Sequence, residues 1–261
     1  MLARIRNRIF DRLARRKYAP AIEVHRTTDL LRLGSSYGGW TFELSRDLCH
    51  TTILSCGLGE DASFDVEFAA RFDAKVIIVD PTPRALVHFE EIQKRIGQPA
   101  TQSYVKGGKQ PATSYDLSRV AKAALILEPS ALWIENTRLK FYAPPNPEHV
   151  SHSIINFQNN YAQNTPHIEV LATTPETLLD KYGLKAIQLM KLDIEGAEVD
   201  VINHMLEKSI LPRQLLVEFD EMNCPSDQSK RNVEITDRLL RLAGYGCCYF
   251  DGLANFLYVL R

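Results

Sequence analysis

Three carboxylates follow directly after an apolar, strand-like segment in the second half of the chain. Residues 187–192 form that segment, and Asp193, Glu195 and Glu198 come after it with Gly196 between the last two. In open α/β sheets, ligands bind at the carboxyl ends of the strands, so acids placed there can hold a ligand or move a proton. Glu195 and Glu198 could instead only favour the N-terminal end of the helix that follows. Asp193 is the first candidate for chemistry, because it stands where the strand should end.

A glycine turn earlier in the chain is the second candidate site. Residues 51–56 have the pattern of a short strand, and Gly57, Gly59, Glu60 and Asp61 come directly after it. The next strand-like segment, residues 75–80, ends in Asp80. Glycines in such a turn let the backbone approach a ligand, and an acid that ends the second strand can bind both hydroxyls of a ribose.

The charge of this turn separates two kinds of cofactor. The dinucleotide fingerprint places a third glycine or alanine where this chain has Ala62. However, Glu60 and Asp61 at a helix N-terminus would repel a pyrophosphate. They suit a ligand that has a positive group and no phosphate, such as S-adenosylmethionine. An NAD-dependent oxidoreductase on a related sheet is the alternative enzyme class.

Two segments resemble the FkbM-type S-adenosylmethionine-dependent methyltransferases. The similarity is closest in residues 57–61 with Phe64 and Asp65, and in the run Lys-Leu-Asp-Ile-Glu-Gly-Ala-Glu at 191–198. It extends more loosely from about residue 38 to residue 261. The resemblance implies an α/β fold with the seven-stranded, Rossmann-like sheet of class I methyltransferases. Its strand order would be 3-2-1-4-5-7-6, with strand 7 antiparallel and helices on both faces.

The resemblance also implies methyl transfer to oxygen, on a hydroxyl of a small molecule or a glycan such as a sugar or polyketide-like acceptor. Many members have Asp two residues before the first glycine, where this chain has Ser55. Glu60 or Asp61 would then hold the methionine ammonium. This departure keeps open a catalytically weak, methyltransferase-like partner protein. The cofactor-binding residues expected on this basis are Ser55, Gly57, Gly59, Glu60, Asp61, Asp80 and Pro81.

The protein's task in methyl transfer is to align the acceptor and remove its proton, because the methyl carbon is already activated. Asp193 is the first candidate for the base or orienting group, and Glu195 lies in the same turn. His152 is a further candidate, since it lies in the polar stretch 144–166. A divalent metal is left open, because Asp193 with the acids that end the strand at 214–220 could bind Mg²⁺.

The remaining elements are predicted from periodicity and turn residues. A glycine-rich turn at 34–39 precedes a helical pattern through Phe42, Leu44 and Leu48, and residues 131–142 resemble a hairpin. Residues 97–115 are polar and predict a loop or lid. The chain is expected to finish in an antiparallel hairpin at 246–260, with a helix at 233–242 before it.

Composition limits the class of protein. The chain has 261 residues, of which 45% are hydrophobic and 24% charged, as in a globular domain. Its net charge of −1 gives no overall field for nucleic acid, so no specific nucleic-acid partner is expected. Five cysteines without a C-x-x-C pair indicate a reduced, cytoplasmic protein. We expect neither a signal peptide nor a membrane-spanning helix.

The N-terminal segment differs from the rest. Residues 1–17 carry seven cations and one anion, and residues 2–17 have the pattern of a basic amphipathic helix. We therefore divide the chain into this helix and its lead-in, 1–30, and a methyltransferase domain, 31–261. The helix could pack on its own domain, associate with a second copy, or lie on an anionic membrane surface.

Overall fold

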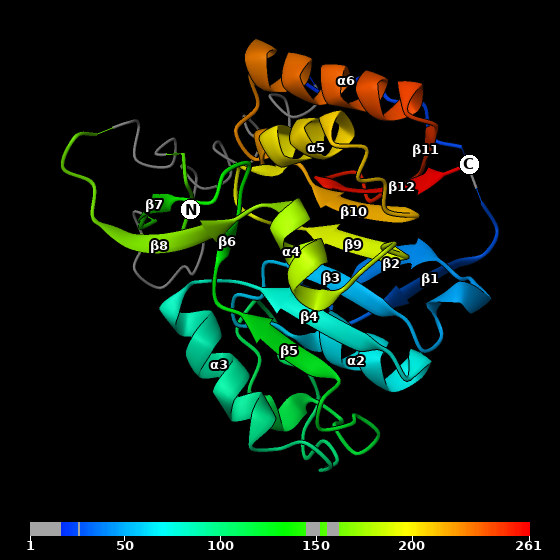
Figure 1. Cartoon of the computed structure of the whole chain (residues 1–261), viewed down its shortest axis with the longest axis vertical. Coiled ribbons are helices and arrows are strands. Elements are labelled where there is room, and N and C mark those ends of the chain that lie inside the picture. The colour runs from blue at the N-terminus through cyan, green and yellow to red at the C-terminus, as the bar shows by residue number, and fades with distance from the viewer. Residues whose placement is uncertain (1–16, 26, 145–151, 156–161) are drawn as a thin grey trace, which may run out of the picture.

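A mixed sheet of seven strands forms the centre of the molecule. The computed structural model describes residues 17–25, 27–144, 152–155 and 162–261. The strands of the sheet are β3 (Thr52–Cys56), β4 (Lys75–Val79), β5 (Leu125–Glu128), β9 (Leu189–Leu192), β10 (Gln214–Glu218), β11 (Tyr245–Phe250) and β12 (Asn255–Leu260). Their order is β11-β12-β10-β9-β3-β4-β5 (Figure 1). The five strands from β10 to β5 are parallel, whereas β12 is antiparallel to both of its neighbours. The expected α/β class is therefore confirmed.

Helices cover both faces of this sheet. Along β3, Ile53 belongs to one apolar core and Leu54 to the other, because successive side chains of a strand face opposite sides. α2 (Ser63–Phe72) and α3 (Pro83–Gln93) bury their apolar stripes against the first face. α4 (Pro175–Tyr182), α5 (Glu198–Glu207) and α6 (Asp227–Leu242) do so against the second. None of the helices in the described part of the chain is long and apolar enough to cross a membrane.

A hairpin replaces the helix that the spacing of Phe42, Leu44 and Leu48 predicts. β1 (Leu30–Leu33) pairs antiparallel with β2 (Trp40–Glu43), and only Arg46–Leu48 form a short 3-10 turn. Phe42 packs into an aromatic cluster on α2, with its ring centroid 5.6 Å from that of Phe68. The buried Gln214 amide also fixes the hairpin, since it bonds the backbone N–H and carbonyl of Glu43. The helix prediction was wrong because tertiary packing decided the backbone conformation.

A second, smaller sheet lies where the parallel strands end (Figure 1). It contains β6 (Ala131–Leu132), β7 (Arg138–Tyr142) and β8 (His167–Thr173) in the order β6-β8-β7. The prediction that residues 131–142 pair with each other was wrong. Both strands pair instead with β8, which lies about thirty residues further along the chain.

Other elements agree with the sequence, with shifts at their ends. The terminal hairpin is confirmed, as β11 pairs antiparallel with β12. α6 begins at Asp227, six residues before the predicted start, because the Ser226 hydroxyl accepts a hydrogen bond from the Ser229 N–H and caps it. β5 was not predicted, although its apolar run also ends in an acid, Glu128. The predicted N-terminal helix, residues 2–17, lies outside the described residues except for Lys17.

Candidate active site

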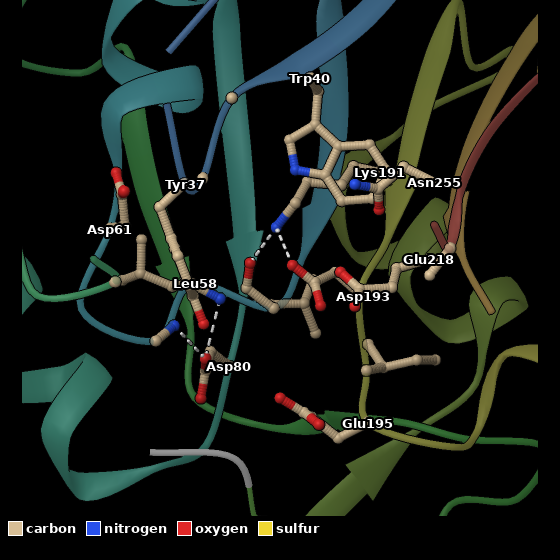
Figure 2. A pocket seen from close by; sticks show the side chains of 18 of the residues that line it. Tyr37, Trp40, Leu58, Asp61, Asp80, Lys191, Asp193, Glu195, Glu218 and Asn255 are labelled. Carbon is tan, nitrogen blue, oxygen red and sulfur yellow. Dashed lines mark hydrogen bonds and ion pairs between the residues drawn. The ribbon is translucent and has the colours of Figure 1, made fainter. Parts of the chain in front are cut away.

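A cavity of about 600 Å³ opens at the carboxyl ends of β3, β4, β9 and β10 (Figure 2). Its walls combine the turns that follow these strands with the β1–β2 hairpin, the small sheet and the start of β12. This volume lies within the range of pockets that bind small molecules. The predicted site residues that line it are Gly57, Gly59, Glu60, Asp61, Asp80, Pro81, His152, Asp193 and Glu195. Ser55 is fully buried within β3 and is not among the lining residues.

The glycine turn is pressed against the end of β9. Gly57 has a φ of +92°, and a Cβ atom at this position would lie 1.8 Å from the Asp193 carbonyl oxygen. The Asp193 N–H in turn donates to the Cys56 carbonyl at 3.1 Å. Only glycine fits this backbone conformation and this close approach. The turn therefore brings backbone, rather than side chains, to the floor of the cavity.

Asp80 holds the same turn from the β4 side. One carboxylate oxygen accepts from the N–H groups of Leu58 (2.8 Å) and Gly59 (3.0 Å). The other accepts from the N–H and the hydroxyl of Thr82. Each oxygen thus already accepts two hydrogen bonds, so a ribose hydroxyl would have to displace one of these donors. Asp80 lines the cavity and its carboxylate shapes the glycine turn, whereas the expected ribose contact stays a prediction.

Glu60 and Asp61 line the cavity, and both carboxylates have protein partners. Glu60 lies 3.7 Å from an Arg84 nitrogen and 3.4 Å from the Lys109 ammonium. Asp61 accepts from the Ser35 hydroxyl at 2.6 Å, and its other oxygen accepts from the Ser63 N–H at the start of α2. The proposed contact with the methionine ammonium stays a prediction, and Asp61 also anchors the β1–β2 hairpin.

Tyr37 and Trp40 extend from that hairpin over the cavity (Figure 2). The Tyr37 ring packs against the loop 97–115, where a Cβ atom on Gly108 would lie 2.4 Å from the ring. Burial and the nearby negative charge of Asp193 raise the pKa of Tyr37. The phenol therefore stays neutral and can donate a hydrogen bond into the cavity.

Lys191 is the functional residue that sequence reasoning missed. It lies in the middle of the apolar strand β9 and is only 4% exposed. Its ammonium donates to the Gly57 carbonyl, lies 3.3 Å from an Asp193 oxygen, and sits 5.5 Å from the centre of the Trp40 ring (Figure 2). The available signal was a lysine within a run of buried apolar residues, since such a charge is rarely buried without a partner.

Two carboxylates lie side by side at the floor of the cavity. β9 and β10 are adjacent and parallel, with Leu192 opposite Val217, so Asp193 and Glu218 follow at the same level. Burial, the charge of Asp193 and that of Asp220 raise the pKa of Glu218 to about 8, although an Asn223 hydrogen bond and Lys191 oppose this. The cation of Lys191 contacts Asp193. At neutral pH Glu218 therefore mainly keeps its proton.

Glu195 and His152 both line the cavity, and Ser153, the residue after His152, links the two segments. Glu195 has a φ of +56°, and its carbonyl accepts from the Ser153 hydroxyl at 2.5 Å. A positive φ is uncommon for a residue other than glycine and often marks a functional turn. The structure thus brings His152 to the same turn as Glu195.

Glu198 has a structural role. It is fully buried, is not among the lining residues, and accepts hydrogen bonds from the N–H groups of Ile194 and Gly196. It therefore fixes the turn that carries Glu195 rather than capping the helix, whose N-cap, Ala197, has no side-chain hydrogen bond. In the described part of the chain, no group of three or more His, Cys, Asp or Glu side chains could hold a metal ion.

The family model of the methyltransferase FkbM domain matches residues 43–246. The chain therefore belongs to the FkbM methyltransferase domain family, as the two motifs predicted. No curated protein matches the chain. One similar solved structure is a mutant form of the 16S rRNA (adenine(1408)-N(1))-methyltransferase from Catenulisporales acidiphilia, at 12% identity. The similarity covers 88% of this chain and 95% of that one, with a TM-score of 0.33.

Proposed function

We propose that the chain is a class I, S-adenosylmethionine-dependent O-methyltransferase that acts on a hydroxyl of a small molecule or glycan. The observation that carries this proposal is the charge of the cavity around its glycine turn. Acidic side chains surround the turn, whereas Arg32 and Lys191 are the only Lys or Arg among the described lining residues. Both cations are turned to protein carbonyls, at Gly34, Gly39 and Gly57. Such a cavity suits a cationic ligand without phosphate.

The topology supports the class I assignment. When the strands of the main sheet are numbered along the chain, their spatial order is 3-2-1-4-5-7-6. The last strand, β12, runs antiparallel to its neighbours. Ligands of open α/β sheets bind at the carboxyl ends of the strands, which is where this cavity lies.

The residues present fit S-adenosylmethionine in the following way. Gly57 and Gly59 would let its methionine part and adenosine approach the backbone, and Asp80 and Pro81 would lie beside the ribose. Tyr37 and Trp40 would cover the bound molecule from the hairpin. When bound, the cofactor supplies a methyl group already activated by a positively charged sulfur. The protein then has to orient the acceptor hydroxyl and take its proton.

Transfer to oxygen is supported by the carboxylates beside the glycine turn. A hydroxyl loses its proton as it is methylated, so the site needs a group that can accept one. Asp193, Glu195, Glu218 and His152 all line the same cavity and could orient or deprotonate such an acceptor. Polar amides at Asn223 and Asn255 face the same space and would bind further hydroxyls of the acceptor.

A calorimetric titration with S-adenosylhomocysteine tests the cofactor, with NADH as the control. We expect micromolar binding of S-adenosylhomocysteine and none of NADH. Preferential binding of NADH would favour the oxidoreductase alternative. Binding of neither would favour the partner-protein alternative. With binding established, a screen of hydroxylated acceptors with labelled methyl donor tests O-methylation directly.

The proposed setting is a reduced compartment such as the cytoplasm. All five cysteines are free thiols, three of them buried, which agrees with that proposal. The acceptor is expected to be a small molecule or glycan. No specific nucleic-acid partner is expected. Association with a second copy or with an anionic membrane surface would involve residues 1–16, which lie outside the described residues.

A further inference from the structure

The position of Asp193 and Glu218 relative to Lys191 suggests a function for the pair. Glu218 ends β10 and Asp193 follows β9, and both side chains point into the cavity (Figure 2). Lys191 lies 3.3 Å from Asp193, whereas Glu218 has an uncharged partner, the Asn223 amide at 3.3 Å. The two acids are therefore unequal, because Lys191 lies within ion-pair distance of Asp193, whereas the direct partner of Glu218 is an uncharged amide.

We propose that the Asp193–Glu218 pair receives the positively charged sulfur of the methyl donor, and that Glu218 releases its proton when the donor binds. Glu218 then accepts the proton of the acceptor hydroxyl. This inference rests on the function proposed above. It assigns the proton acceptor to Glu218, and makes Asp193 and Lys191 the residues that position the charge.

The charges around Glu218 define its state before the donor binds. Asp193 after β9 and Asp220 after β10 face it with negative charge, Lys191 opposes them, and Tyr37 above is neutral. Burial adds to the effect of these acids and raises the pKa of Glu218 to about 8. A cation that enters the cavity favours the ionised carboxylate and lowers this pKa. The donor therefore converts Glu218 into a base.

The transfer step balances without another reactant. As the acceptor oxygen forms its bond to the methyl carbon, the carbon–sulfur bond breaks and leaves its electron pair on sulfur. The hydroxyl proton passes to the ionised Glu218. Once the cation is consumed, the neutral thioether product no longer stabilises the charge of Glu218, so a protonated Glu218 again matches its surroundings.

Proton release measured by calorimetry tests this proposal without an acceptor. Each ligand is titrated at about pH 7.5 in buffers of different ionisation enthalpy, with EDTA present, and the dependence of the heat on the buffer gives the protons released. We expect S-adenosylmethionine to release roughly half a proton or more per molecule bound. S-adenosylhomocysteine, which lacks the positive sulfur, should release close to none.

Three variants assign the proton. Glu218→Gln should still bind both ligands but abolish the difference in proton release between them. Asp193→Asn should reduce the release, because Glu218 would lose its charged neighbour and ionise before the donor binds. The matched control is Glu221→Gln, since burial raises the pKa of Glu221 to about 7 but this residue is not among those lining the cavity. It should leave the release unchanged.

Equal proton release on binding of the two ligands would overturn the proposal. It would also be overturned if Glu218→Gln released as many protons as the unmodified protein, or if Glu221→Gln released none. A failure of both ligands to bind the unmodified protein would instead overturn the proposed function. Thermal melts of each variant show whether it is folded, so a misfolded variant is not counted. If Glu218→Gln does not fold, the proton release of Asp193→Asn tests the proposal, and an unchanged release in that variant would overturn it.

Discussion

Gly57 shows how one residue can fix the geometry of a site. Its positive φ and its contact with the Asp193 carbonyl both require the absence of a side chain. The Lys191 ammonium binds the Gly57 carbonyl on one side and the Asp193 carboxylate on the other. The glycine and the acids could be predicted from the sequence as turn and strand-end residues. The lysine between them could not, because periodicity does not show where a long side chain ends.

Gly57→Ala should lower the free energy of unfolding by at least about 2 kcal/mol and abolish binding of S-adenosylhomocysteine. The methyl group would meet the Asp193 carbonyl, so the turn would have to move out of the cavity. Urea denaturation and calorimetry measure both effects. The control is Gly107→Ala, which shares a positive φ but has open space around its Cβ position. It should lose only about 1 kcal/mol and still bind.

Asp80→Ala should weaken S-adenosylhomocysteine binding at least about 100-fold. The substitution removes the acceptor of four hydrogen bonds, two of which shape the glycine turn, in addition to the expected ribose contact. Calorimetry measures the affinity. Asp116→Ala, which removes an acceptor from an exposed turn at Ser118, should bind normally. Unchanged affinity in Asp80→Ala would contradict both tasks of this carboxylate.

Asp193→Asn should keep S-adenosylhomocysteine binding while lowering kcat by about 100-fold or more on an acceptor found in the screen. The amide retains the shape of the side chain but not its negative charge. It therefore no longer raises the pKa of Glu218, which becomes a weaker base. Initial rates with labelled donor give kcat, and calorimetry gives the affinity. A fully active variant would remove Asp193 from the chemistry.

Among the elements, those with local signals could be predicted and those with distant partners could not. β3 ends at a glycine turn, β4, β9 and β10 are apolar runs that end at acids, and each of the four was predicted. The β1–β2 hairpin was interpreted as a helix, because Phe42 and Leu48 fit helical spacing and the amide of Gln214, which holds Glu43, lies 171 residues away. β6 and β7 were paired with each other for the same reason, since β8 comes later in the chain.

The β1–β2 hairpin positions Tyr37 through Ser35. The Ser35 hydroxyl accepts from the N–H groups of Tyr37 and Gly38 and donates to Asp61. Ser35→Ala should lower the free energy of unfolding by about 1–3 kcal/mol and weaken cofactor binding, because the hairpin loses its anchor. Ser45→Ala is the control, since its hydroxyl only caps an exposed 3-10 turn. It should cost at most about 1 kcal/mol and leave the affinity unchanged.

At the scale of the whole molecule, three buried carboxyl groups that form no ion pair among the described residues influence how the free energy of unfolding depends on pH. Burial raises the pKa of Asp65 to about 6, of Glu221 to about 7 and of Glu218 to about 8. The folded state thus binds protons that the unfolded chain releases above its ordinary carboxyl pKa of about 4. Their contribution to stability is present at low pH and is lost as the pH rises through these folded values.

Thermal stability should therefore fall as the pH rises from about 6.5 to 8.5 in the absence of ligand. Below about 6.5 His88 should offset part of this trend, because burial lowers its pKa and the unfolded chain then takes up one proton that the folded one does not. Melting curves across this range test the prediction. Glu221→Gln should flatten the part of the decline that lies below about pH 7. A melting temperature that rises towards pH 8.5 would contradict the prediction.

The contact between Gly57 and Asp193 has a consequence for how this site can diverge. It joins two strands that are neighbours in the sheet, while β4, α3, β5 and the entire small sheet lie between them in the chain. Segments inserted there can lengthen, shorten or change composition without altering the register of β3 against β9. The architecture thus separates the contact between Gly57 and Asp193 from the part of the cavity wall that the small sheet forms, so substitutions in that wall can change the shape of the cavity without moving this contact.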